Sequence, residues 1–326
     1  MATQPLRLSA CFMLALSAAA MQVATAQTYP SKPVRWISTY AAGGPVDLTA
    51  RPVAQTLSGI LGQQVIIEHR PGANGNIGAL AVVKSAPDGY TILVTSTSQL
   101  TINPSLYPVM PFDTDKDLAP ITLISMTPTV LITHPSVKSG SVRELMAFAR
   151  ANPGKIRYAS AGNGSINHLS TELLKMIEKV DLVHIPYKGG GPALTAVVAG
   201  EVDMMIISVP TTIPFIKDGR IRALGVSAGT RQRSLPDVPT MTEAGVAGFE
   251  SAAGIGLLAP SATPRAIVSQ LHTSAVKAMN TPETRNLLLA SGVELIGSTP
   301  EEFSRLIKAE SARWDKVVKA GKIKLD

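Results

Sequence analysis

The sequence predicts an α/β protein whose mostly parallel strands alternate with helices. From Val34 to Ser96, apolar and β-branched runs alternate with longer runs of helical period, in the order strand, helix, strand, helix, strand. The alternation resumes at Ser141 and continues to Val226. In both parts a strand ends at a glycine-containing turn from which a helix starts. This pattern is typical of parallel sheets that carry helices on both faces.

The first strand is expected to begin at Val34, because residues such as Trp36 favour extended structure. The turn Gly43-Gly44-Pro45 follows, and the apolar period from Val46 to Leu61 predicts a helix that stops at Gly62. The other elements expected in this part are strands over Gln64–Glu68 and Tyr90–Ser96 and a helix over Ile77–Ser85.

A longer apolar run from Ile121 to Ile132 leads into the second part. Ser141 is the expected N-cap of a helix over Ser141–Ala151, and Glu144 stands at the spacing of a capping box. Further strands are expected over Ile156–Ser160, Leu182–Pro186, Val202–Ser208, Ile221–Val226, Gly254–Ala259 and Val293–Ile296. Further helices are expected over Ser165–Lys179, Gly189–Val198, Arg265–Met279, Pro282–Ser291 and, with an amphipathic pattern, Pro300–Ala320.

The first 26 residues are predicted to form a cleavable signal peptide. Arg7 precedes an apolar segment from Ala10 to Ala20, and Ala24-Thr25-Ala26 supplies the small residues of a cleavage site. A lipoprotein-like box at Leu8–Cys11 lies before the apolar segment, which argues against lipidation. Cys11 is the only cysteine, so cleavage after Ala26 would leave a chain that forms no disulfide.

The composition argues against several functional classes. The net charge of +7 comes from scattered basic residues, and aromatic residues make up only 4% of the chain. Nucleic-acid binding would favour clustered basic residues with stacking aromatics, so no nucleic-acid partner is expected. Patterns typical of phosphate loops, zinc proteases and paired cysteines are missing, and we expect no cofactor and no metal. No stretch after the signal peptide reaches the roughly 18 apolar residues of a membrane-spanning helix.

The turn Ala41-Ala42-Gly43-Gly44 is the leading candidate for ligand binding. A strand that leads through a glycine turn into a helix leaves backbone N–H groups without partners at the positive end of the helix dipole. An anion could bind there without a basic side chain. The third strand ends at Ser96-Thr97-Ser98, which a parallel sheet places at the same edge. The alternative is that the glycines only permit a tight turn.

A second turn, Ser160-Ala161-Gly162-Asn163, repeats this arrangement in the second part. Asn163 or Ser165 is expected to cap the following helix, with the N–H groups from Gly164 onward facing outward. Tyr187 and Ser208 follow or end two further strands and could line the same site. A capped turn that binds nothing is the alternative here as well.

Ser165 and His168 carry an enzymatic alternative. They stand one helical turn apart, with Glu172 four residues after His168. A single histidine–glutamate pair is a weak metal signal. Gly164-Ser165-Ile166 also lacks the closing glycine of a hydrolase elbow. An exported hydrolase or lyase that uses Ser165 and His168 is therefore the second hypothesis.

Short motifs occur in a fixed order along nearly the whole predicted mature chain. In the first part they are Tyr29-Pro30 with Lys32-Pro33, Gly43-Gly44 with Asp47 and Ala50-Arg51, Arg70–Ala73, Gly75–Gly78 and Pro87–Thr91. Later motifs are Ser160–Ser165 with His168-Leu169, Pro186–Gly190, Pro236 with Val238–Thr240, Glu243–Gly245, and Ala259-Pro260 with Thr263-Pro264. Each motif is weak alone, but together they resemble the Bug family, the solute receptors of tripartite tricarboxylate transporters.

The resemblance implies a two-lobed type II periplasmic-binding-protein fold that closes on a small carboxylate. Lobe 1 would comprise residues 27–127 and 249–326, and lobe 2 would comprise residues 128–248. Each lobe would be a mostly parallel sheet flanked by helices.

The resemblance also implies how the carboxylate is held, mainly through backbone groups and bridging waters in first-lobe loops. These loops correspond to Ala41–Gly44 with Asp47, and to Ser96–Ser98. The second lobe would add Ser160–Asn163 and the helix start at Ser165.

Two segments depart from the family pattern near the expected cleft. Tyr40-Ala41-Ala42 replaces a proline-rich segment, and Ser251–Gly254 lacks a tryptophan. Both departures leave the identity of the carboxylate open, while the fold is unaffected.

The leading hypothesis is a periplasmic, monomeric solute receptor without catalytic activity. Its partners would be a small carboxylate and either membrane permease subunits or a signalling protein. A transport receptor and a ligand sensor would share this sequence pattern, so both hypotheses are kept.

Overall fold

A computed structural model describes residues 29–325. The predicted signal peptide, residues 1–26, lies outside the described residues. The first part of the chain alternates as expected. Its elements are β1 (Val34–Ser38), α2 (Pro45–Leu61), β2 (Val65–His69), the short helix η1 (Ala73–Gly75), α3 (Asn76–Val83) and β3 (Thr91–Ser96).

Two helices in the first part were not expected, α4 (Thr97–Leu106) and α5 (Thr114–Asp117). Helix α4 contains Pro104, and it buries polar residues such as Gln99 and Asn103 beside apolar ones. It therefore lacks the amphipathic period from which helices are predicted.

The rest of the chain follows the expected order with one further addition. The elements up to the end of the second alternation are β4 (Leu118–Thr133), α6 (Val142–Ala151), β5 (Arg157–Ser160), α7 (Ile166–Glu178), β6 (Val183–Pro186), α8 (Gly190–Val198), β7 (Met204–Ser208), α9 (Val209–Lys217) and β8 (Arg222–Val226). The last elements are β9 (Ala252–Pro260), α10 (Arg265–Met279), α11 (Pro282–Ala290), β10 (Glu294–Leu295) and α12 (Pro300–Gly321). Helix α9 was not expected, and it contains Pro214 in its interior.

The expected cap of α6 is present in a modified form. The Ser141 side chain accepts a hydrogen bond from the Glu144 backbone N–H, while the Glu144 carboxylate accepts from Gly140 rather than from Ser141. A full capping box, with both reciprocal bonds, forms at Thr299 and Glu302 at the start of α12.

The strands form one continuous sheet in the order β2-β1-β3-β9-β4-β7-β5-β6, with β8 and β10 also paired to β4. Strands β2, β1 and β3 are parallel, and so are β7, β5 and β6. The pairings of β9 with β3 and β4, and of β4 with β7, are antiparallel. The sheet is thus mixed. Strand β4 carries the chain from the first part to the second and β9 carries it back, and these two antiparallel strands lie between two sets of parallel strands.

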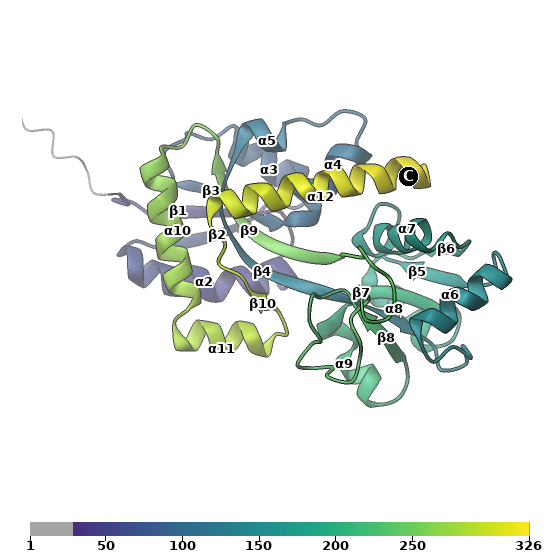
Figure 1. The fold of residues 1–326 in the computed structure, drawn as a ribbon. Coiled ribbons are helices and arrows are strands. Elements are labelled where there is room, and N and C mark those ends of the chain that lie inside the picture. The colour runs from purple at the N-terminus through teal and green to yellow at the C-terminus, as the bar shows by residue number, and fades with distance from the viewer. Residues whose placement is uncertain (1–28, 326) are drawn as a thin grey trace, which may run out of the picture.

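Strand β4 changes its partner between Pro128 and Thr129. Up to Pro128 it pairs with β9, and from Thr129 on it pairs with β7 (Figure 1). At this point the Thr129 N–H donates to Ser227 Oγ at 2.8 Å, and the Thr129 hydroxyl donates to the Ser251 carbonyl at 3.1 Å. Hydrogen bonds from Thr129 to the Ser227 side chain and to the Ser251 backbone therefore join three chain segments at this point.

Helix α12 connects the two parts as well. Phe303 and Ile307 lie in a core cluster with Leu93 of the first part, whereas Trp314 and Val317 lie in a cluster of the second part. Figure 1 shows the helix running from the first part to a position beside α7. The two cores are therefore bridged by one continuous helix.

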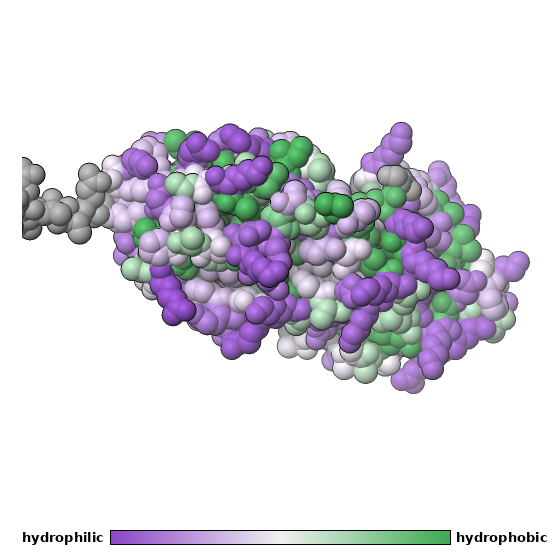
Figure 2. Space-filling view, turned by 90° about the horizontal axis from the view of Figure 1, so that it is seen from above, coloured by the Kyte–Doolittle hydropathy of each residue, from purple (hydrophilic) through white to green (hydrophobic). Residues whose placement is uncertain are grey.

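The face seen from above mixes hydrophilic and hydrophobic residues rather than presenting one continuous apolar area (Figure 2). Among the described residues, no helix combines the length and apolar character needed to cross a bilayer.

Candidate functional site

The turn after β1 is exposed at Ala41, Ala42 and Gly43. Gly43 has a φ of +77°, a conformation that favours glycine. Its N–H donates to the Asp47 carboxylate at 2.9 Å, and the Gly44 N–H donates to the Ala41 carbonyl at 3.4 Å. Both glycine amides are thus used inside the turn, contrary to the expectation that they are free for an anion. Among the described residues, the Ala41 and Ala42 amides have no acceptor.

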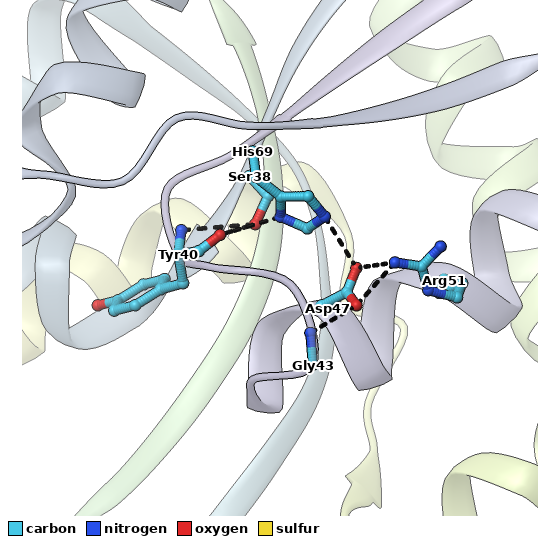
Figure 3. A network of polar contacts seen from close by, with 6 residues as sticks. All are labelled: Ser38, Tyr40, Gly43, Asp47, Arg51 and His69. Atoms are coloured by element: carbon cyan, nitrogen blue, oxygen red, sulfur yellow. Dashed lines mark hydrogen bonds and ion pairs between the residues drawn. The ribbon is translucent and has the colours of Figure 1, made fainter.

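The Asp47 carboxylate holds this turn in place through hydrogen bonds and ion pairs (Figure 3). The side chain of Asp47 is 3% exposed, and its carboxylate also accepts from Arg51 Nη2 at 2.8 Å and lies 3.4 Å from His69 Nε2. Burial would raise the pKa of Asp47, but the bonds from Arg51 and Gly43 and the positive charge of Arg51 lower it overall. The carboxylate therefore stabilises the turn and has little free surface for a ligand.

The turn after β3 lies at the same edge, because β1 and β3 are adjacent and parallel. Ser96 caps α4 by accepting from the Ser98 N–H at 3.3 Å. Its side chain also bonds to Tyr40, whose burial raises the pKa of the phenol to about 12. Thr97 is fully buried, and its hydroxyl accepts from the Gly254 N–H at 3.0 Å. The Thr39 and Thr95 hydroxyls, 2.7 Å apart, join the ends of β1 and β3, and the side chain of Thr97 is buried.

The second-part turn is held by its own hydrogen bonds. Ser165 is the N-cap of α7, accepting from the His168 N–H at 3.3 Å. The N–H groups of Gly162 and Gly164 donate to Ser160 Oγ at 3.1 Å and to His168 Nδ1 at 3.2 Å. The expectation that the amides face outward from Gly164 onward is therefore wrong at Gly164. The Ser165 N–H also donates within the turn, to the Gly162 carbonyl at 3.2 Å. From Gly164 onward, the first amides without an acceptor among the described residues are therefore those of Ile166 and Asn167.

Three stacked rings support this turn from behind. His184 stacks on His168 with 3.9 Å between ring centroids and on Tyr158 with 4.8 Å, and the Tyr158 and His168 centroids lie 6.2 Å apart. His184 Nε2 lies 2.6 Å from Ser160 Oγ. Burial lowers the pKa of His168, and Lys175 adds to that effect while Glu172 opposes it. His168 is thus favoured as a neutral ring that accepts the Gly164 N–H.

The enzymatic pair is not assembled in this structure. Ser165 Oγ accepts from the backbone of His168, and the His168 ring is engaged by Gly164. No group of three or more His, Cys, Asp or Glu side chains suited to a metal occurs within residues 29–325.

Tyr187 and Ser208 lie at the sheet edge where Ser160 ends its strand, because β5 is parallel to both β6 and β7. The Tyr187 N–H donates to the Ser160 carbonyl at 3.0 Å. Burial raises the pKa of the Tyr187 phenol, with Glu201 in support and Arg157 opposing. The structure therefore brings the second-part candidates together along one edge.

A cavity of about 410 Å³ lies beside this turn. Asn163 is the member of the predicted site that lines it, together with the outer side of α7 at His168, Glu172 and Lys175 and the C-terminal segment Gly321–Leu325. Its position behind α7 differs from the strand edge where the candidate residues gather.

Glu310 on α12 is a residue that sequence reasoning missed. It is 3% exposed, and its Oε2 lies 3.4 Å from Thr101 Oγ1 of α4. Its spacing gives the signal, because Glu310 stands in register with the buried residues Ile307 and Trp314 of the apolar stripe. A charged residue inside such a stripe marks a buried polar contact.

A mixed sheet shared by two parts, with helix starts of both parts at the strand ends, fits the class of two-lobed solute-binding proteins. The family model "Tripartite tricarboxylate transporter family receptor" matches residues 49–323. Protein BugT of Bordetella pertussis is 35% identical over 302 residues, which cover 92% of this chain and 93% of BugT.

Two solved structures are also similar to this chain in sequence and in fold. A structure from R. palustris with adipate has a TM-score of 0.77 at 34% identity, covering 91% of this chain and 100% of that one. MatC from Rhodopseudomonas palustris with bound malate has a TM-score of 0.74 at 32% identity, covering 89% and 100%. The chain belongs to the tripartite tricarboxylate transporter receptor family, which confirms the resemblance to Bug proteins and the two-lobed α/β fold. Family membership implies a periplasmic location.

Proposed function

We propose that this protein captures a small dicarboxylate, of the class of adipate or malate, at the strand edges of its two lobes. The observation that carries this proposal is the placing of the α2, α4 and α7 starts at the ends of parallel strands in both parts. A carboxylate near helix N-termini is stabilised by the helix dipole and by charge-assisted bonds from amides. Relatives with adipate and with malate support the ligand class.

The donors that we assign to the ligand differ from the glycines. They are the amides of Ala41 and Ala42, the Thr97 amide and the Ser98 hydroxyl at the start of α4, and the amides of Ile166 and Asn167. Gly43, Gly44, Gly162 and Gly164 shape the turns, and Asp47 and Ser160 brace them. Tyr187 and Ser208 contribute side chains to the rim.

We assign residues 27–127 and 249–326 to one lobe and residues 128–248 to the other. The change of β4 partner at Thr129, and its bonds to Ser227 and Ser251, support a hinge at this boundary. Ligand binding would favour a closed state of the two lobes. Because α12 packs in both cores, the two lobes would also rotate about this helix when they close.

Calorimetric titration with adipate, malate, a tricarboxylate and a neutral ester of adipate tests the proposal. Saturable binding of one or more acids, without binding of the ester, is expected. Failure of every acid to bind the folded protein would contradict the proposal.

The protein would act without chemistry of its own. Incubation with carboxylic esters and amides should give no product that depends on Ser165. Turnover that is lost in Ser165→Ala would instead support the hydrolase or lyase alternative. The geometry of Ser165 and His168 gives that alternative no support.

We also propose that the protein is exported to the periplasm, is cleaved after Ala26 and is a monomer there. N-terminal sequencing of the periplasmic protein should read from Gln27. Co-purification with permease subunits would identify a transport receptor, whereas capture of a signalling protein would identify a sensor.

A further inference from the structure

A buried carboxyl group outside the predicted site lies against the first turns of α4. Thr101 Oγ1 donates to the Thr97 carbonyl at 3.0 Å and lies 3.4 Å from Glu310 Oε2, and the Thr97 hydroxyl also lowers the pKa of this carboxyl. Both threonines are fully buried. The Thr97 hydroxyl accepts from the Gly254 N–H, so it joins β9 to the start of α4 on the side of the Glu310 carboxyl.

Glu310 also lies where α12 passes from one core to the other. One helical turn before it, Ile307 packs in the first-part core, and one turn after it, Trp314 packs in the second-part core. A charge at this position is therefore shielded from solvent between the lobes and directly behind the start of α4.

Few charged groups offset a charge on this carboxyl. Burial raises the pKa of Glu310 to about 7, Arg313 on the same helix and the two threonine hydroxyls oppose that rise, and Glu250 before β9 adds to it. Arg313 is itself paired with Glu250. Burial is the largest of these effects, so the pKa of about 7 places the change of charge of Glu310 near neutral pH.

We propose that Glu310 is a positioning residue that couples the affinity of the α4 start for an anion to the protonation of the carboxyl behind it. The inference rests on the proposed carboxylate function. The protonated carboxyl keeps Thr97 in place without charge. The ionised carboxyl adds a negative charge behind the helix start, which opposes a carboxylate ligand. By reciprocity, ligand binding draws a proton onto Glu310.

Titration calorimetry with adipate and malate at pH 6 and pH 8 tests the inference. The wild type should bind roughly fivefold to tenfold more tightly at pH 6, the scale of a like-charge interaction near a protein surface. Near pH 7, measurements in two buffers of different ionisation enthalpy should show proton uptake on binding. Glu310→Gln should bind at pH 8 about as tightly as the wild type does at pH 6, without that uptake.

Glu301→Gln is the matched control, since it removes one carboxylate from the exposed first turn of the same helix. It should keep the pH dependence of the wild type. The comparison also cancels the titration of the ligand itself. Thr101→Val is a second variant that keeps the charge and removes one hydroxyl donor, so it should move the midpoint of the pH dependence upward.

The outcomes separate the two proposals. A folded Glu310→Gln that keeps the wild-type pH dependence and proton uptake would overturn the inference while leaving the receptor function intact. If Glu310→Gln does not fold, an unmoved midpoint in Thr101→Val would overturn it. Absence of binding by the wild type at both pH values would contradict the receptor function itself, and the inference with it.

Discussion

At the scale of single residues, Asp47 and the glycines of the turn after β1 have roles in the structure that differ from those expected from the sequence. Asp47 stands at the third position of α2, where a carboxylate can reach back to the turn, and this spacing is visible in the sequence. The contact with His69 is not, because it depends on β2 lying beside β1. The sequence therefore identifies the important residue but not its role as a brace.

Replacing Asp47 by Asn should lower the free energy of unfolding by about 1–3 kcal/mol at pH 7, because the buried acceptor loses its charge-assisted bonds. The pKa of Asp47 is lowered in the folded state, so its contribution is present at neutral pH and is lost as the pH falls below its ordinary value of 3.8. Denaturant unfolding between pH 7 and pH 3 measures both effects. An equal loss on acidification in wild type and Asp47→Asn would contradict this account.

At the scale of elements, helix ends with a positive φ are the parts most directly readable from sequence. Gly62 ends α2 with a φ of +67°, as expected, and Gly43 precedes its start with a φ of +77°. Helices α4 and α9 were missed because buried polar residues or prolines hide their period. Local pattern thus predicts amphipathic helices well and buried polar helices poorly.

The two glycines at the ends of α2 allow a matched test of the binding turn. A Cβ would meet nothing within 4 Å at Gly43 or at Gly62, and both residues have a positive φ, so Val at either position carries similar backbone strain. Both variants should lose about 1–2 kcal/mol of stability. Only Gly43→Val should weaken adipate or malate binding, since it distorts the Ala41 and Ala42 amides. Equal affinities in calorimetry would contradict a role for this turn.

Close packing of α12 on the sheet gives a prediction about stability. A Cβ at Gly256 on β9 would lie 2.3 Å from Phe303 Cζ. Gly256→Ala should therefore lower the free energy of unfolding by about 1–3 kcal/mol. Gly59→Ala is the control, because Gly59 lies inside α2 with nothing within 4 Å, and it should stabilise by up to about 1 kcal/mol. Thermal or denaturant unfolding that ranks the two variants in the opposite order would contradict the packing.

At the scale of the whole molecule, the alternation of strands and helices was sufficient to predict the α/β class and the strand edges where the candidate turns meet. It could not predict that β4 and β9 make the middle of the sheet antiparallel, since a long apolar run such as Ile121–Ile132 does not show its partners. Nor could it show that α12, with Trp314, enters the second core. Contacts between distant segments decide both features.

The ring stack beside α7 likewise depends on contacts between distant segments, which the sequence does not show. His168 and His184 belong to different elements, and only the fold brings their rings to 3.9 Å. The sequence presented His168 as a possible partner of Ser165, whereas the structure uses it to hold Gly164. A histidine's nearest polar neighbours in the chain are thus a poor guide to its contacts in the fold.

A crystal structure of the protein with adipate or malate tests the central claim most directly. We expect one acid group within hydrogen-bond distance of the Ala41 and Ala42 amides and the α4 start, with the Ile166 and Asn167 amides on the opposing lobe contacting the ligand. A ligand held instead by Lys175 and the C-terminal segment in the cavity behind α7, with the helix starts empty, would contradict it.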